Sequence, residues 1–282
     1  MKLSIITINY NNVAGLEKTL QSVDMQTCND FEHVIIDGGS TDGSAEIIKA
    51  YAEKSQHPIK WVSERDNGIY NAMNKGIRMA SGDYIQILNS GDMLYNYTIE
   101  EQMFAAIENY GNPPILYGNM IKQWTNGRQL IDVCRGNYAN TETGEVEWTL
   151  YDFIYGTINH DPTFVRHDLF DKYGLYDENL KICSDWKWFV SAVVFGAEKV
   201  FYTNLNVTIF DMTGVSETNI TFREEERKTE LRKMFPEAVL KDYYTWHFPI
   251  SQATRLKKYH LWWCANFIER ALFKLEKWRI IR

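Results

Sequence analysis

The fold is decided by the stretch GDYIQILNSGD at residues 82–92, an apolar run followed by a polar turn. The run at 84–88 is typical of a strand that is buried on both faces of a mostly parallel sheet. The turn NSG at 89–91 ends the strand, and the carboxylate of Asp92 follows directly. Because ligands of open α/β sheets bind outside the carboxyl ends of the strands, we expect Asp92 to lie at a ligand site.

A carboxylate at such a place suits a divalent cation that in turn binds a phosphate group. We therefore hypothesise that Asp92 holds a divalent metal against the diphosphate of a nucleotide-sugar. For this stretch taken alone, the alternative is a turn that binds no ligand, because Asn, Ser, Gly and Asp are common turn residues.

Strands and helices alternate through the first half of the chain. Besides the strand at 84–88, apolar runs predict strands at 3–8, 33–37 and 59–63. Apolar residues at helical spacing predict helices between these strands, at 13–23 with Asn12 as N-cap, at 45–52 and at 69–80. This order predicts an α/β fold with a doubly wound, mostly parallel sheet.

The second half of the chain is more mixed. Thr98 begins a capping-box sequence for a helix that Gly111 closes, and the Asn-Gly pair at 126–127 predicts a hairpin. Residues 136–150 are polar and are predicted to form a loop over a site. The other predicted segments are a strand at 163–165, a helix at 167–173, a helix from its cap Ser184 to Gly196, an extended segment at 200–210 and a helix at 222–235.

The composition excludes several classes of protein. The four cysteines are far apart and form no CxxC pair, so neither a disulfide framework nor a zinc site is expected. The N-terminal apolar run is too short for a signal peptide, and no apolar run reaches the about 18 residues of a membrane span. The chain is therefore expected to be cytoplasmic. Aromatic residues make up 14% of it, a content that suits sugar stacking and core packing equally well.

Charge is distributed unevenly. Residues 253–282 carry a net charge of +6, whereas the whole chain carries −7. An acidic body argues against nucleic acid as a partner. Basic residues interleaved with Trp and Phe at 255–282 suit a helix on the anionic inner face of the cell membrane. The alternative is a helix that packs on the acidic body or on a second copy of the chain, as in a homodimer.

The loop DGGSTDGS at 37–44 lies between a predicted strand and a predicted helix, which is where nucleotides bind. Asp37 can accept a hydrogen bond from a base or a ribose, and the glycines let a ligand approach the backbone. The spacing is neither GxGxxG nor a GK[ST] phosphate loop, so a dehydrogenase or a kinase is disfavoured.

Four segments together resemble the family 2 glycosyltransferases: LSIITINYN at 3–11, DGGSTDG at 37–43, DNGIYNAMNKG at 66–76 and ASGDYIQILNSGD at 80–92. The resemblance covers about residues 1–215 and implies the GT-A fold, Rossmann-like, with inversion of the anomeric centre. It implies a GT-A domain at 1–220, with a nucleotide-sugar half at 1–110 and an acceptor half at 111–220. A helical extension would then follow at 221–282.

The resemblance also implies roles for individual residues. Thr7 and Asp37 would contact the nucleobase, Asp66 the nucleoside and Asp92 the metal, Mn²⁺ or Mg²⁺. Family members often have an acid where this chain has Asn89, so the diphosphate oxygens would have to complete the coordination of the metal. The full donor-binding set is Thr7, Asn9, Asp37, Asp66, Asn74, Asn89 and Asp92.

Asp185 matches the family's general base, with Ser184 in place of the usual Glu. A carboxylate there can take the proton of an acceptor hydroxyl, although an acid near a helix N-terminus is also favoured by the helix dipole alone. His160, Trp186 and Trp188 are acceptor-binding candidates; the alternatives are a structural turn for His160 and core packing for a tryptophan. Asp211 is either a second metal ligand or a loop acid.

These features predict an inverting glycosyltransferase of the hexosyltransferase type. Its donor is predicted to be a UDP-sugar, and its acceptor a hydroxyl of a surface glycan or a lipid-linked saccharide. The alternative is a non-catalytic nucleotide-sugar or glycan-binding module on the same fold, for which Asn89 and Ser184 are the best support.

Overall fold

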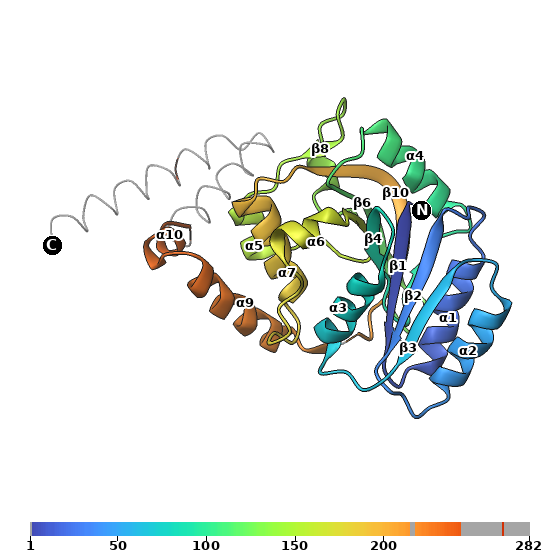
Figure 1. Cartoon of the computed structure of the whole chain (residues 1–282). Coiled ribbons are helices and arrows are strands. Elements are labelled where there is room, and N and C mark those ends of the chain that lie inside the picture. Colours follow the sequence, from blue (N-terminus) through green and yellow to red (C-terminus); the bar gives the residue numbers. More distant parts are fainter. Residues whose placement is uncertain (1, 215–217, 244–266, 268–282) are drawn as a thin grey trace. The chain divides into compact units, whose positions relative to one another are not determined.

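The structure is a computed structural model that describes residues 2–214, 218–243 and 267 (Figure 1). The chain divides into two compact units, Met1–Arg223 and Glu224–Arg282. The first unit contains a sheet with the strand order β3-β2-β1-β4-β9-β6-β10-β5, with β7 paired to β6 and β8 paired to β10. The predicted helix at 255–282 lies outside the described residues, except for Phe267.

The first half of the sheet is parallel, as predicted. β1 (Leu3–Asn9) pairs in parallel with β2 (Phe31–Asp37) and β4 (Tyr84–Ile87), and β2 pairs in parallel with β3 (Ile59–Ser63). Figure 1 shows α3 (Ile69–Met79) on one face of these strands and α1 (Val13–Asp24) and α2 (Ser44–Lys54) on the other. Because both faces are covered, β1 and β2 are buried along their whole length.

The second half of the sheet is mixed. β9 (Thr163–Arg166) lies antiparallel between β4 and β6 (Ile115–Gln123), while β6 runs parallel to β10 (Val200–Asp211). β10 also pairs with β5 (Met93–Leu94) and β8 (Glu145–Val146), and the predicted hairpin is β6 with β7 (Gln129–Asp132). Because β9 is antiparallel to β4, the residues just before β9 lie beside the carboxyl end of β4. This register places the segment that contains His160 next to Asn89.

The helices of the second half vary from six to 15 residues in length. They are α4 (Ile99–Asn109), α5 (Leu150–Tyr155), α6 (Asp168–Tyr173), α7 (Ser184–Phe189), α9 (Ile220–Met234) and α10 (Glu237–Asp242). The helix predicted to run to Gly196 is α-helical only as far as Phe189 and continues as a π-helix at Val190–Phe195. The predicted loop at 136–150 contains a 3₁₀ turn and β8. Within the described ranges, no helix is both long enough and apolar enough to cross a membrane.

One predicted helix cap was wrong, and another is right in position only. Thr98 is the N-cap of α4, but its side chain makes no capping bond, and its hydroxyl donates to Asn96 Oδ1 at 3.1 Å. Cys183 is the cap of α7, and Ser184 is already its first helical residue. The predicted cap of α1 is confirmed, since the side chain of Asn12 accepts a hydrogen bond from the Gly15 N–H at 3.2 Å.

Candidate active site

The carboxyl ends of β1, β2 and β4 meet at one edge of the sheet. Asn9 ends β1 and pairs with Asp37, the last residue of β2. Just beyond β4, the Ser90 N–H donates to the Ile8 carbonyl at 3.1 Å. Three segments that are distant in sequence therefore share the edge at which α/β sheets bind ligands.

Asp92 is held tightly in the turn after β4. The Asp211 N–H, at the end of β10, donates to Asp92 Oδ1 at 2.8 Å, and the Thr19 hydroxyl donates to the Asp92 carbonyl at 2.7 Å. Gly91 has φ = +109°, a conformation that favours glycine and that lets the chain turn here. Asp211 thus lies beside Asp92, while its own Oδ1 accepts hydrogen bonds from Thr213.

Asp161 is a second acid beside Asp92. Both side chains are almost fully buried, with exposed fractions of 4% for Asp92 and 2% for Asp161. Burial, together with the neighbouring Asp161 carboxyl, raises the pKa of Asp92 well above its usual range. Two adjacent buried acids in a protein interior need either a proton or a cation between them.

This arrangement fits a hard divalent cation at Asp92. A carboxylate is a preferred oxygen ligand of such ions, and magnesium sites commonly take further oxygens from a substrate phosphate. Among the residues that the structure describes, no group of three or more His, Cys, Asp and Glu side chains is arranged to hold a metal. A metal at Asp92 would therefore depend on the diphosphate of a donor for the rest of its coordination.

Asp185 lies near the start of α7 and is held by two side chains from other segments. The Tyr70 hydroxyl of α3 donates to its Oδ1 at 3.0 Å, and His160 Nδ1 lies 3.0 Å from its Oδ2. Burial opposes the charged form, but the hydrogen bond and the charge of His160 lower the pKa of Asp185 below its ordinary value. Asp185 is thus an ionised carboxylate in a largely buried place.

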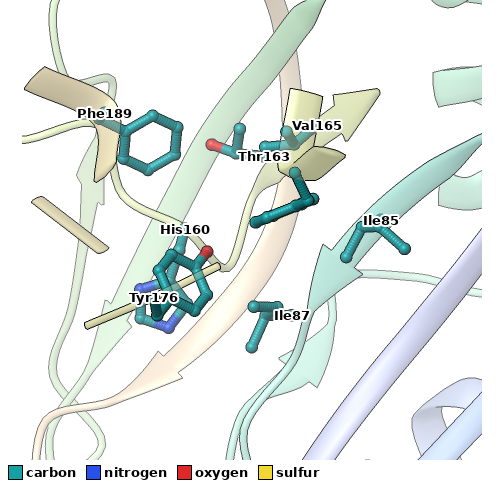
Figure 2. Close-up of a pocket in the computed structure, with 8 residues that line it drawn as sticks. Ile85, Ile87, His160, Thr163, Val165, Tyr176 and Phe189 are labelled. Carbon is teal, nitrogen blue, oxygen red and sulfur yellow. The ribbon is translucent and has the colours of Figure 1, made fainter. Parts of the chain in front are cut away.

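His160 connects the two acid groups. Its Nδ1 contacts Asp185, and its Nε2 lies 3.0 Å from Asn89 Nδ2 and 3.4 Å from Asp161 Oδ1. Figure 2 shows the ring in a pocket lined mostly by apolar side chains, among them Ile87. Burial alone would lower the pKa of His160, but the charges of Asp161 and Asp185 raise it to about 9. Asp92 and Asp185 therefore belong to one site, joined through Asp161 and His160.

The predicted nucleobase contacts are buried in the structure. Asp37 accepts hydrogen bonds from Ser63, Asn9 and both the N–H and the hydroxyl of Ser40. Thr7 Oγ1 lies 2.9 Å from His33 Nε2, and neither Thr7 nor Asp37 is exposed. Asp37 thus holds the loop at 37–44 from the inside through Ser40, whereas Thr7 contacts His33 of the neighbouring strand.

Asp66 and Tyr10 approach the same loop from outside. A Cβ atom at Gly38 would lie 3.2 Å from Asp66 Oδ2 and 3.1 Å from the Tyr10 ring, so a larger residue there would have to displace these side chains slightly. Lys75 Nζ holds Asp66 Oδ1 at 2.5 Å. Tyr10 is 67% exposed, and the sequence reasoning missed it. Its place directly after the strand end at Asn9 was the available signal.

Three predicted contacts do not face an open site. Asn74 is buried and uses both ends of its amide to hold the backbone N–H and carbonyl of Tyr176. Trp186 and Trp188 are buried as well, and their indole N–H groups donate to backbone carbonyls of Phe153 and Gly174. Both tryptophans are core residues because α7 packs its apolar face inward, and we leave them out of the acceptor site.

A family model described as Glycosyl transferase family 2 matches residues 4–157, more than half of the chain. The chain belongs to the family 2 glycosyltransferases. A PGL/p-HBAD biosynthesis glycosyltransferase of Mycobacterium bovis is 30% identical over 185 residues, which are 65% of this chain and 66% of that protein. An uncharacterized glycosyltransferase of Mycobacterium tuberculosis is 30% identical over 83% of this chain and 85% of its own length.

Solved structures of transferases share the fold of this glycosyltransferase. S. aureus TarS 1–349 in complex with UDP superimposes with a TM-score of 0.61 at 22% identity, over 75% of this chain and 60% of that one. The mannosyltransferase PcManGT from Pyrobaculum calidifontis, in complex with GDP-Man and Mn²⁺, superimposes with a TM-score of 0.56 at 16% identity. The match covers 74% of this chain and 56% of that one. The GT-A fold expected from the sequence is confirmed.

Proposed function

We propose that this glycosyltransferase moves a sugar, with inversion, from a nucleotide-diphosphate donor to a hydroxyl of a glycan or a lipid-linked saccharide. The observation that best supports this is the convergence of Asp92 and Asp185, which come from distant parts of the chain. UDP is the proposed nucleotide, since TarS has been solved with UDP and with UDP-GlcNAc. A GDP-sugar is the competing donor, because PcManGT was solved with GDP-Man.

Asp185 would act as the general base. Its carboxylate takes the proton of the acceptor hydroxyl as that oxygen bonds to C1 of the sugar. The bond from C1 to the diphosphate oxygen breaks in the same step, and the nucleoside diphosphate leaves from the opposite face. One displacement of this kind inverts C1 and leaves the proton on Asp185. Tyr70 and His160 keep the carboxylate ionised and directed.

Asp92 is the residue that would hold Mn²⁺ or Mg²⁺ against the diphosphate. A bound divalent metal would neutralise the charge that develops on the leaving group. The support for it is the burial of Asp92 beside Asp161, where a cation would offset the repulsion between the two carboxyl groups, and the Mn²⁺ in PcManGT. The predicted second ligand, Asp211, lies beside Asp92 and stays a proposal.

Replacing the base tests the catalytic role directly. Asp185→Asn keeps the shape of the side chain and removes its ability to take a proton, so transfer is expected to fall by about 100- to 10,000-fold. UDP affinity, measured by calorimetry, is expected to stay within about twofold. Asp177→Asn is the matched control, because Asp177 is paired with Lys187 of α7. Full transfer by Asp185→Asn would rule out this mechanism.

The donor and the metal can be tested together by thermal shift. We expect one of the UDP-, GDP- and dTDP-sugars to stabilise the chain more with manganese than with EDTA. Asp92→Ala is expected to abolish the manganese-dependent part of that shift, because it removes the ligand that joins protein and metal. An unchanged shift in Asp92→Ala would place the metal elsewhere.

We also propose that the chain works at the inner face of the cell membrane. The support is the composition of residues 255–282, in which Lys and Arg alternate with Trp, Phe and Leu. A lipid-linked acceptor would be available there. The alternative occupant of this segment is a second copy of the chain.

A further inference from the structure

Asn89 stands in the turn that carries Asp92, but its side chain is turned toward His160. Its Nδ2 lies 3.0 Å from His160 Nε2. Its backbone carbonyl meanwhile accepts a hydrogen bond from the Asp92 N–H at 3.0 Å. The main chain of Asn89 thus stabilises the turn that carries Asp92, while its side-chain amide contacts the imidazole of His160.

The other side of the imidazole holds the base. His160 Nδ1 lies 3.0 Å from Asp185 Oδ2, so both ring nitrogens have partners on opposite sides of the ring. The surrounding pocket, lined by Ile87, Tyr176 and Phe189 among others, is mostly apolar (Figure 2). A rotation of the ring would break both hydrogen bonds at once and would offer the freed nitrogens few polar partners.

We propose that Asn89 is a positioning residue for the general base: it fixes the His160 ring, and the ring in turn directs the carboxylate of Asp185. This inference rests on the proposed function, because it gives Asp185 the role of base. It replaces the donor contact that the sequence predicted for Asn89.

The oxygen of the Asn89 side-chain amide supports this role. Within the described part of the chain, Asn89 Oδ1 is buried and has no hydrogen-bond partner. Turning the amide by half a rotation places this oxygen against His160 Nε2, since the oxygen and nitrogen of an amide are nearly isosteric. His160 then donates from both nitrogens, to Asn89 and to Asp185. The negative neighbours Asp161 and Asp185 favour this doubly protonated ring.

An amide at position 89 also has an electrostatic advantage over an acid. The site already holds the buried carboxyl groups of Asp92, Asp161 and Asp185. A fourth carboxyl group beside them would add like-charge repulsion in a medium of low polarity. Asparagine provides the acceptor that the imidazole needs without that charge.

Steady-state kinetics separate a positioning role from donor binding. With the donor found in the screen, Asn89→Ala is expected to lower kcat by about 10- to 100-fold, because a misplaced catalytic group costs that much. KM for the donor and the Kd of UDP are expected to stay within about twofold. Ser90→Ala is the matched control in the same turn, because its hydroxyl bonds Asn12 and not His160. Equal losses in UDP affinity and kcat/KM, with kcat intact, would make Asn89 a donor ligand and overturn the proposal.

A second measurement needs no substrate. In the chain with ¹³C- and ¹⁵N-labelled histidine, the ring signals of His160 are assigned by their loss in His160→Gln, and their titration is followed by NMR. Asn89→Ala is expected to lower the pKa of His160 by about one unit, whereas Ser90→Ala leaves it unchanged. An unchanged titration in Asn89→Ala overturns the positioning role. A wild-type chain that is inactive with every donor overturns the proposed function instead, and the titration then decides on the contact alone.

Discussion

At the scale of single residues, the site balances buried charge. Asp92, Asp161 and Asp185 bring three carboxyl groups into a small volume, and His160 lies between them. The direction of the pKa shift differs among the three acids. Asp185, which has hydrogen bonds from His160 and Tyr70, has a lowered pKa, whereas Asp92 and Asp161 have raised ones. Environments that separate the pKa values of neighbouring acids in this way suit the acid with the lowered pKa to a role as base. They suit the acids with raised pKa values to sharing a proton or binding a cation.

Tyr70→Phe tests this balance. The substitution removes the hydroxyl that donates to Asp185 Oδ1 and leaves the ring in place. Since that hydrogen bond favours the carboxylate, its loss is expected to raise the pKa of Asp185 and to move the acidic limb of the pH–kcat profile to higher pH, by about one unit or less. Activity on the alkaline side is expected to change little. Tyr84→Phe, whose hydroxyl bonds the Pro113 carbonyl, is the control. An acidic limb that stays in place would show that Tyr70 does not act on the base.

At the scale of elements, α3 links Asp66, the proposed nucleoside contact, to Asp185, the proposed base. It begins directly after Gly68, close to Asp66, and its second residue is Tyr70. Its buried face packs on β1 and β2, so its position is set by the sheet. The close approach depends on Gly76, where a Cβ atom would lie 2.4 Å from Ile6 Cγ2 and 3.5 Å from Ile36 Cγ1.

Gly76→Ala is expected to push α3 away from the sheet. Overpacking of this kind costs about 1–3 kcal/mol of unfolding free energy, and the displaced Tyr70 would lower kcat as well. Urea denaturation followed by circular dichroism measures the first effect. Arg78→Ala in the same helix is the control and is expected to stay within about 0.5 kcal/mol, because its side chain is 56% exposed and its ion pair is long. Equal stability of both variants would contradict the tight packing.

At the scale of the whole molecule, charge is separated along the chain. The net charge of +6 in residues 253–282 contrasts with −7 for the entire sequence. Such a segment is attracted to anionic lipid, with about 1 kcal/mol for each Lys or Arg near the surface. The proposed membrane location depends on this attraction and on the apolar residues between the basic ones.

Vesicle sedimentation tests the location with the full chain. Binding to vesicles with phosphatidylglycerol is expected, and it should weaken as salt is added because the attraction is electrostatic. Reversing four charges, Lys257→Glu, Lys258→Glu, Lys274→Glu and Lys277→Glu, is expected to abolish binding while leaving donor binding intact. If this variant instead changes from dimer to monomer in ultracentrifugation and vesicle binding is unaffected, the segment pairs with a second copy.

The sequence by itself determined the parallel half of the sheet and the places of the turns that follow its strands. That was achievable because local signals suffice there: apolar runs form buried strands, and polar residues directly after them mark the carboxyl ends. Asp92 could be singled out for the same reason, whereas Asp185 was singled out because its short motif at 182–189 resembles that of the family 2 glycosyltransferases.

Only the tertiary structure decided which side chains meet. The contacts of Asp185 with Tyr70 and His160, and that of Asn89 with His160, join residues far apart in the chain. They depend on β9 running antiparallel beside β4, a pairing that no local pattern encodes. Burial was also decided only by the tertiary structure. Trp186 and Trp188 are core residues because their face of α7 packs inward, and which face of a helix is covered depends on what lies opposite it.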